Sequence, residues 1–227
     1  MKFNFVMMMK VIKINPQTPN LKLLQEAADI ILDDGVIGYP TETVYGLGAN
    51  ALSGNAIEKV FQLKRREKNK PILVIASNLD KVKELVSFFP ETAELLAQYF
   101  WPGPLTIIFK AAAHLTKSLL GDGNSIGIRI PDNRICLELL KICKIPLTST
   151  SANLAGEKNP ISADEVIDNF SNELELVIDG GLARSTMSST VLDLSTEKSV
   201  LMREGVIKKI EIEQIIGSNV DEIKRER

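Results

Sequence analysis

The sequence contains a single histidine, His114, two cysteines and no Cys-x-x-Cys pair among its 227 residues. A metal site built from cysteine and histidine therefore lacks enough ligands. A Ser-His-Asp hydrolase would have to use His114, which we interpret as a surface or loop residue. Cys136 and Cys143 lie seven residues apart beside leucines, so we interpret them as reduced, buried thiols on one face of a helix.

Long apolar runs and an excess of positive charge are also absent. No segment has the length of apolar sequence that spans a bilayer, so we expect no membrane association. The start, MKFNFVMMMKVIKI, has no cleavage site of small residues and is not interpreted as a signal peptide. The formal net charge of −2 argues against a protein that coats nucleic acid through phosphates alone. We therefore expect a cytoplasmic protein, with residues 1–8 as an N-terminal extension.

Strand and helix patterns alternate along most of the chain. Strands are predicted at 11–14, 36–40, 71–76, 105–110, 125–130, 145–149, 175–179, 189–195 and 199–204, the last two as a hairpin. Helices are predicted at 19–35, 53–66, 78–89, 91–100, 132–143, 163–170 and 209–216, with Ser53 and Asp132 as caps of the second and fifth. The order favours one α/β domain over residues 9–216, with an open, twisted, mixed sheet and flanking helices. Residues 217–227 form a charged tail that we expect to be frayed.

Ligands of open α/β sheets collect in the loops beyond the strand ends, so these loops carry the functional hypotheses. YPTETVYGLGA (39–49) combines threonines, tyrosines and glycines, which suits either a ligand or a tight turn with capping threonines. KRREKNKP (64–71) holds five cations, which suits either a polyphosphate or a solvated helix end. Arg129 stands inside the apolar strand SIGIRIP, and it requires a carboxylate of the protein or of a ligand.

TSTSAN (148–153) ends a predicted strand with four hydroxyls and one amide. No base that could activate a nucleophile is near in sequence, so these groups suit binding of phosphate oxygens or of a substrate hydroxyl. Hydroxyls recur in STMSST (185–190), and Arg203 follows the last predicted strand in MREG.

Taken together, these stretches resemble the YrdC-like family of threonylcarbamoyl-AMP synthases. The resemblance runs in order through YPTETVYGLGA, KRREKNKP, WPGPLT, SIGIRIP, PLTSTSANLAG, SSTVLDL and MREG, over about residues 20–207. It implies a twisted α/β sheet around a deep positive cavity, in the short, single-domain form. It also implies condensation of L-threonine, bicarbonate or CO2, and ATP into threonylcarbamoyl-AMP with loss of pyrophosphate. A partner complex would then transfer the threonylcarbamoyl group to the tRNA adenosine beside the anticodon.

The resemblance implies roles for fourteen side chains. Those implied to bind threonine are Thr41, Thr43, Tyr45, Arg129, Ser149 and Ser189. Those implied to bind ATP are Lys64, Arg66, Lys70, Ser125, Ser151, Asn153, Asn159 and Arg203. Lys64 and Arg66 match the family's K-x-R and are the implied catalytic pair. No protein nucleophile is needed, since the carbamate of threonine attacks the α-phosphate. Mg²⁺ is expected on the triphosphate, held by phosphate oxygens and water.

One departure and two alternatives accompany this interpretation. Glu67 stands where the family commonly has proline, so the loop before Pro71 can take a different path. A non-catalytic RNA-binding module is the first alternative, and weak RNA binding would be compatible with a positive cavity. The second is a carbamoyl-transfer domain like that of hydrogenase maturation enzymes, whose accompanying cysteine-rich segments this chain lacks.

Overall fold

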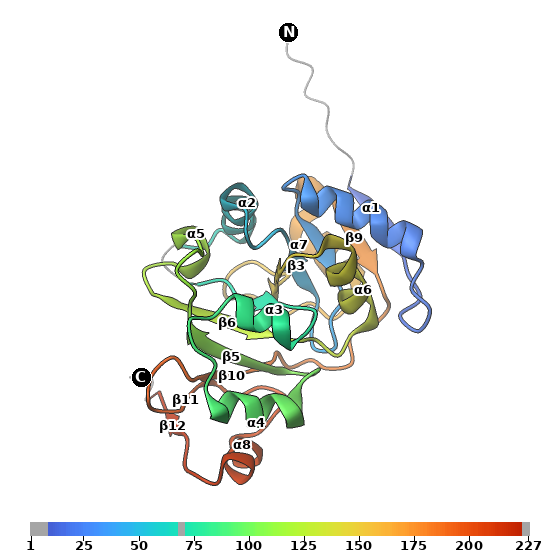
Figure 1. Cartoon of the computed structure of the whole chain (residues 1–227). Helices are drawn as coiled ribbons and strands as arrows, with labels where there is room; N and C mark the ends of the chain where they lie inside the picture. Colours follow the sequence, from blue (N-terminus) through green and yellow to red (C-terminus); the bar gives the residue numbers. More distant parts are fainter. Residues whose placement is uncertain (1–8, 68–70, 224–227) are drawn as a thin grey trace.

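Twelve short strands form two mixed sheets within residues 9–67 and 71–223, the part of the chain that the computed structural model describes (Figure 1). The first sheet has the order β1 (Lys10–Lys13), β9 (Leu176–Asp179), β2 (Ile37–Tyr39), β3 (Gly46–Gly48) and β8 (Thr150–Ser151). The second has the order β12 (Asp221–Glu222), β11 (Val200–Arg203), β10 (Thr190–Asp193), β5 (Leu105–Lys110), β6 (Ser125–Arg129), β4 (Val74–Ile75) and β7 (Leu147–Thr148). The predicted α/β fold with mixed strand pairing is confirmed, with the strands divided between two sheets.

The stretch TSTSAN carries the chain from one sheet to the other. Thr148 ends β7, which pairs antiparallel with β4 in the second sheet. Thr150 and Ser151 form β8, which pairs antiparallel with β3 in the first sheet. Ser149 stands between the two strands, and its backbone N–H donates to the carbonyl of Leu73 at 2.7 Å. The side chains of this stretch are therefore held where the two sheets meet.

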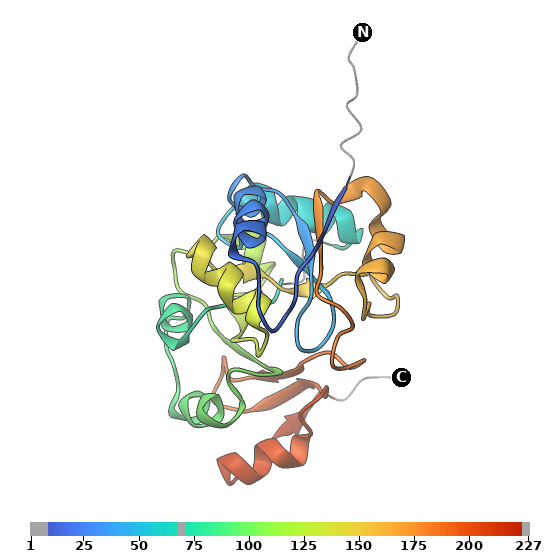
Figure 2. The same cartoon turned by 90° about the vertical axis from the view of Figure 1, so that its right-hand side faces the viewer.

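Helices cover both ends of the molecule. They are α1 (Leu21–Leu32), α2 (Gly54–Lys64), α3 (Leu79–Glu84), α4 (Glu91–Phe100), α5 (Lys117–Leu120), α6 (Arg134–Cys143), α7 (Ala163–Phe170) and α8 (Lys209–Ile216), with a 3-10 turn at Ser171–Glu173. Helices α1 and α6 pack side by side above the first sheet, and α4 and α8 pack together at the opposite end (Figures 1 and 2). Each packs through an apolar stripe, as the helical period predicts.

Two buried clusters account for the core. The smaller lies among α1, α6 and the strands beside them, with Leu24, Ile31 and Leu139 fully buried. The larger extends through the second sheet and the remaining helices. Cys136 and Cys143 are buried free thiols, as predicted, and burial raises the pKa of Cys143 to about 12.

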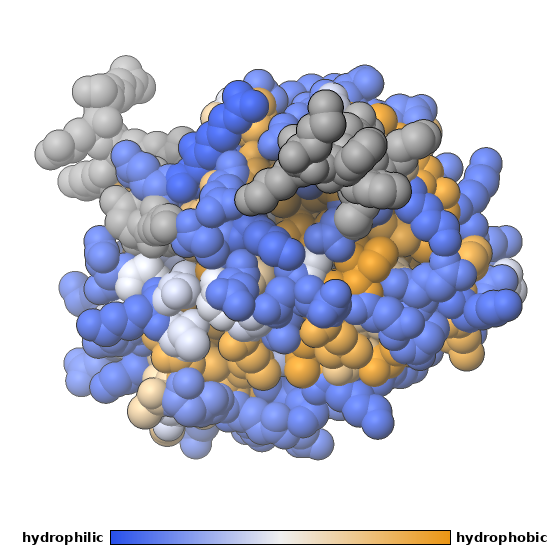
Figure 3. Space-filling model, turned by 90° about the horizontal axis from the view of Figure 1, so that it is seen from above, coloured by the Kyte–Doolittle hydropathy of each residue, from blue (hydrophilic) through white to orange (hydrophobic). Residues whose placement is uncertain are grey.

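The outer surface mixes hydrophilic side chains with smaller exposed hydrophobic areas (Figure 3). Within the described ranges, no helix combines the length and the apolar composition that crossing a membrane requires.

Several local predictions are corrected by the structure. Asn133 rather than Asp132 caps α6, because the Asn133 side chain accepts from the backbone N–H of Cys136. The helix predicted at 78–89 is shortened to α3, while β3 and α5 form in segments predicted as loops. The tail is not frayed at Asp221 and Glu222, which pair with β11 as β12 (Figure 1). Residues 1–8 and 224–227 lie outside the described residues.

Candidate functional site

A cavity of about 950 Å³ opens where the two sheets meet, and both sheets contribute to its lining. Twelve of the fourteen predicted site residues line it: Thr41, Thr43, Tyr45, Lys64, Arg66, Arg129, Ser149, Ser151, Asn153, Asn159, Ser189 and Arg203. Ser125, at the start of β6, is not among the lining residues. Lys70 lies outside the described residues. Motifs spread over more than 160 residues of sequence thus converge on one space.

The threonine pair in the PTET loop has a fixed hydrogen-bond direction. The hydroxyl of Thr41 donates to the carbonyl of Val44 at 2.7 Å and accepts from the backbone N–H of Thr43 at 3.1 Å. A hydroxyl has one proton, so Thr43 must be the donor across the 2.9 Å contact between the two side-chain oxygens. The Thr43 oxygen therefore has only lone pairs left, and it presents an acceptor to the cavity.

Ser189, in contrast to Thr43, presents a hydrogen-bond donor to the cavity. Its oxygen lies 2.9 Å from the hydroxyl of the buried Thr106, whose side chain has no other hydrogen-bond partner among the described residues. Thr106 would leave its proton unpaired unless it donates to Ser189. The same oxygen accepts from Nη2 of Arg203 at 3.3 Å. The proton of Ser189 is therefore free to point into the cavity, and Ser189 presents a donor there.

Arg203 and Ser189 are held together by a close backbone crossing. The guanidinium donates through Nε and Nη2 to the carbonyl of Ser189, at 3.1 and 2.9 Å. The backbone of Gly205 lies so close that a Cβ there would stand 2.2 Å from the carbonyl oxygen of Ser188. Only glycine allows this approach, and it brings the MREG segment against the hydroxyl segment before β10.

Lys64 is the centre of a network that links α2 to the residues after β8. Its ammonium donates to the carbonyls of Ser151 and Asn153, at 2.5 and 2.7 Å, and to Oδ1 of Asn153 at 3.2 Å. Ser151 donates to the same Oδ1 at 2.6 Å, while Nδ2 of Asn153 donates to the carbonyl of Glu157 at 2.6 Å. All three N–H groups of Lys64 are thus used by protein acceptors. Lys64 thus holds the SAN segment through its three hydrogen bonds, whereas Arg66 donates to one acceptor among the described residues, the carbonyl of Pro71, at 3.3 Å.

This network predicts a dependence on pH. Burial, followed by the positive charge of Arg66, lowers the pKa of Lys64 to about 8. A neutral amine has two N–H groups for three acceptors, so on the ATP-binding role that the family resemblance implies for Lys64, we expect kcat/KM for ATP to fall above about pH 8. The unfolded chain would keep this proton up to the ordinary pKa of 10.5, so this lysine's contribution to folding stability rises with pH between the two values. Thermal unfolding measured beside the kinetics separates the two trends, and a flat kcat/KM from about pH 7 to about pH 9.5 contradicts the prediction.

Arg129 meets a carboxylate of the protein, one of the two possibilities that the sequence left open. Its Nη1 donates to Oε1 of Glu42, the residue between the two threonines, and both side chains are 6% exposed. Arg129 lines the cavity and Glu42 does not. The sequence analysis missed Glu42, although an acidic residue inside an apolar and hydroxyl-rich loop was a signal for it.

More cations than carboxylates line the cavity. Four cations line it, namely Lys64, Arg66, Arg129 and Arg203, and Glu157 is the sole carboxylate among its described lining residues. Burial and then the positive charge of Arg129 lower the pKa of Arg203. An apolar wall of Leu73, Ile108, Val191 and Met202 stands beside them. The cavity therefore suits a ligand with both anionic and flat apolar parts.

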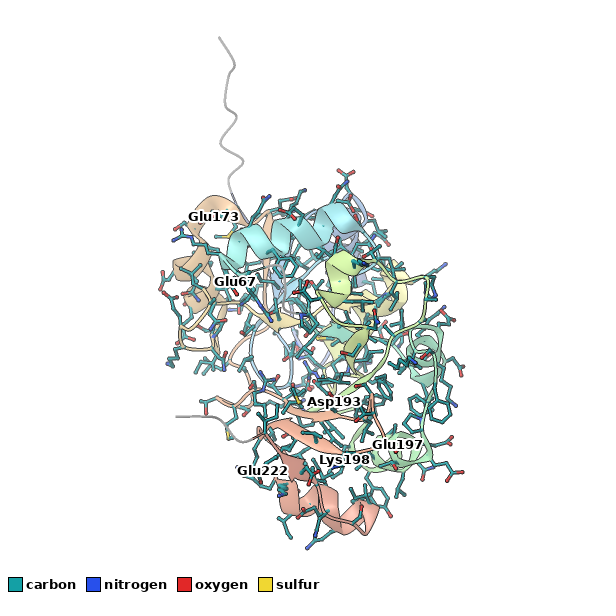
Figure 4. All side chains as sticks on the ribbon, turned by 90° about the vertical axis from the view of Figure 1, so that its left-hand side faces the viewer. Glu67, Glu173, Asp193, Glu197, Lys198 and Glu222 are labelled. Carbon is teal, nitrogen blue, oxygen red and sulfur yellow. The ribbon has the colours of Figure 1, made fainter. Side chains whose placement is uncertain are left out.

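Tyr45 lines the cavity, whereas the nearby Glu67 does not. The hydroxyl of Tyr45 donates to the carbonyl of Gly181 at 2.6 Å and accepts from the N–H of Gly180 at 3.2 Å, which ties the start of the 180–189 loop to the cavity. Burial raises the pKa of Tyr45 to about 12, so it remains a donor. Glu67 is exposed just beyond α2 (Figure 4), and it does not line the cavity.

No group of three or more His, Cys, Asp or Glu side chains suited to a metal occurs in the described part of the chain. The one histidine, His114, is exposed in a loop and is not among the described residues that line the cavity. Fold and cavity together define an α/β protein with a cavity at the junction of two sheets, whose cations and hydroxyls suit an anionic ligand.

Comparisons with known proteins give the family. Residues 29–205 match the model of the family Sua5_yciO_yrdC, described as "Telomere recombination", and the chain belongs to this family. A Pyrococcus abyssi protein named threonylcarbamoyl-AMP synthase is 38% identical over 191 residues, which are 84% of this chain and 56% of that protein. A Methanocaldococcus jannaschii protein named putative threonylcarbamoyl-AMP synthase is 36% identical over 200 residues, 87% of this chain and 94% of that protein.

The fold of a solved relative agrees. The crystal structure of P. abyssi Sua5 complexed with L-threonine superposes with a TM-score of 0.90 at 34% identity, covering 93% of this chain and 62% of that one. The chain thus spans little more than half the length of the P. abyssi relative.

Proposed function

We propose that this protein is an L-threonylcarbamoyladenylate synthase. This nucleotidyltransferase would condense L-threonine, bicarbonate or CO2, and ATP into threonylcarbamoyl-AMP and pyrophosphate. The observation that carries the proposal is the convergence of twelve predicted side chains, four of them cations at the centre or rim, on one cavity. The relatives' names support the proposed reaction, and the relative complexed with L-threonine supports the amino acid.

The polarity of the cavity suits both substrates. The carboxylate of threonine requires donors, which Arg129 and Ser189 present, while its hydroxyl or amine can donate to the oxygen of Thr43. The triphosphate requires several cations, which Arg66 and Arg203 would supply through N–H groups that have no acceptor among the described residues. Lys64 would act mainly by holding Ser151 and Asn153 in place.

In the proposed reaction the threonine amine adds to CO2 and loses a proton, which gives a carbamate. A carbamate oxygen then attacks the α-phosphorus of ATP, the bond to the β-phosphate oxygen breaks, and pyrophosphate leaves. The attacking group belongs to the substrate, so the protein needs no nucleophile of its own. The contribution of the chain is to align the two substrates and to neutralise charge on the phosphates.

A metal ion and further partners complete the proposal. Glu157 is the one carboxylate among the cavity's described lining residues, so Mg²⁺ would be held chiefly by phosphate oxygens and water. The product would pass to a transfer complex that modifies tRNA beside the anticodon. We expect the reaction to take place in the cytoplasm, where its proposed tRNA acceptor is used.

Pyrophosphate release by the purified chain tests the function directly. With ATP present, we expect release only when both L-threonine and bicarbonate are added. Release that ignores threonine would contradict the proposed reaction. No release with retained ATP binding would also contradict it, and titration with RNA at several salt concentrations would then test the RNA-binding alternative.

A further inference from the structure

Glu42 is a buried carboxylate that the proposed reaction does not explain. Its side chain is 6% exposed, and its one hydrogen bond joins Oε1 to Nη1 of Arg129. Its second oxygen, Oε2, is the buried side-chain polar atom that has no hydrogen-bond partner among the described residues. Burying a charge with an unused acceptor is unfavourable, and an apolar pair would often be at least as stable. The fold therefore retains Glu42 at a cost to stability.

The position of Glu42 indicates what it contributes. The hydroxyls of its neighbours Thr41 and Thr43 both belong to the cavity wall, whereas Glu42 does not line the cavity. Arg129 lines the cavity and contacts Glu42, so Arg129 links the buried carboxylate to the cavity. The charge of Glu42 also affects Tyr39 and Cys136. Burial raises the pKa of each of these groups most, and the negative charge of Glu42 raises it further. Both stay neutral, so Arg129 is the counter-charge of Glu42.

The shape of the guanidinium completes the argument. It is planar, with five N–H groups in fixed directions, so fixing Nη1 restricts the orientation of the whole plane. No partner other than Glu42 is recorded for Arg129 side-chain donors within the described residues. The remaining N–H groups are therefore available on the cavity side. A side chain with four rotatable bonds would otherwise sample several orientations, at a cost in entropy when a ligand binds.

We infer that Glu42 is a positioning residue for the amino-acid substrate: it holds Arg129 so that the free edge of the guanidinium meets the substrate carboxylate. This inference rests on the proposed function and assigns Glu42 a role through Arg129, without contact to substrate. A positioning role for Glu42 differs from that of a simple counter-charge, because the distance and direction of the carboxylate matter as much as its negative charge.

The test uses two variants in the pyrophosphate assay. Glu42→Gln removes the charge, and Glu42→Asp keeps the charge but shortens the side chain by one methylene. Because Arg129 is no longer held in its orientation in either variant, we expect KM for L-threonine to rise about tenfold in both. We expect kcat and KM for ATP to stay close to those of the original chain. Calorimetric titration of L-threonine should show the same loss of affinity. Glu138→Gln, the same change in a pair with Lys141 on α6 in which Glu138 is 25% exposed, is the control and should leave these kinetic constants unchanged.

Three results would overturn the inference. A KM for threonine that falls in Glu42→Gln and stays normal in Glu42→Asp would mean that Glu42 is only a counter-charge. Parallel losses for threonine and ATP, with a lowered Tm, would mean that it is only structural. Unchanged KM values in an active protein would mean that it has no role. Absence of threonine-dependent pyrophosphate release from the original chain would instead refute the proposed function.

Discussion

Arg129→Met alone is expected to destabilise the fold by about 3–5 kcal/mol, because it leaves the Glu42 carboxylate buried without a counter-charge. The double variant Arg129→Met with Glu42→Gln should recover most of this loss, since a neutral amide is far easier to bury than a carboxylate. Denaturant unfolding of the single and double variants measures the difference. The two substitutions should therefore be strongly non-additive.

An exposed ion pair supplies the control for this prediction. Arg184 contacts Asp132 at 3.4 Å on the surface, and Arg184→Met should change stability by less than about 0.5 kcal/mol. Equal stabilities of Arg129→Met and the double variant would show that Glu42 does not depend on Arg129. The double variant also gives a clean kinetic test, because it is expected to be folded: KM for threonine should rise much more than KM for ATP.

Lys64→Met is expected to lower turnover by about 100-fold, because the segment with Ser151 and Asn153 loses the ammonium that orders it beside the phosphates. Stability should fall by about 1–3 kcal/mol, since two carbonyls and an amide oxygen lose a charged donor. Steady-state kinetics with ATP and denaturant unfolding measure the two effects. The fold should survive, so the loss of activity will exceed what unfolding accounts for.

Lys59 gives the matched control on the same helix. It is exposed, with a contact of 3.8 Å to Glu175, so Lys59→Met should leave turnover unchanged and stability nearly so. Normal turnover in Lys64→Met would show that the cations of KRREKNKP serve only as a solvated helix end.

The elements that follow a clear period were predictable from the sequence. The apolar stripes of α1 and α6 lie on one face of each helix, and both helices form close to the predicted bounds. The hairpin of β10 and β11 also forms as predicted. The strand β3 was missed because Gly46, Leu47 and Gly48 have little intrinsic strand preference, and pairing with β2 and β8 creates it. The division into two sheets depends on the same tertiary pairing.

The candidate site could be predicted as a set of residues but not as a set of contacts. The apolar strand around Arg129 indicated that this residue needs a carboxylate. Its partner Glu42 lies 87 residues away in the sequence, however, and no sequence pattern near Arg129 identifies it. Composition also indicated that Lys64 could meet phosphate. That its three N–H groups are taken by carbonyls of the SAN segment follows only from the fold. Ser125 shows the converse, because a matching motif position does not line the cavity.

Gly205 has a consequence for how such proteins are recognised. Glycine is required at position 205 because the backbone crosses that of Ser188 at this point and leaves no space for a Cβ atom. That requirement concerns chain packing, and it would persist in a descendant that had lost Arg129 or Lys64 and with them the chemistry. The final glycine of MREG is therefore required by the packing of the fold, whereas the charged side chains around the cavity are required by the proposed reaction, and a related chain could retain the first without the second.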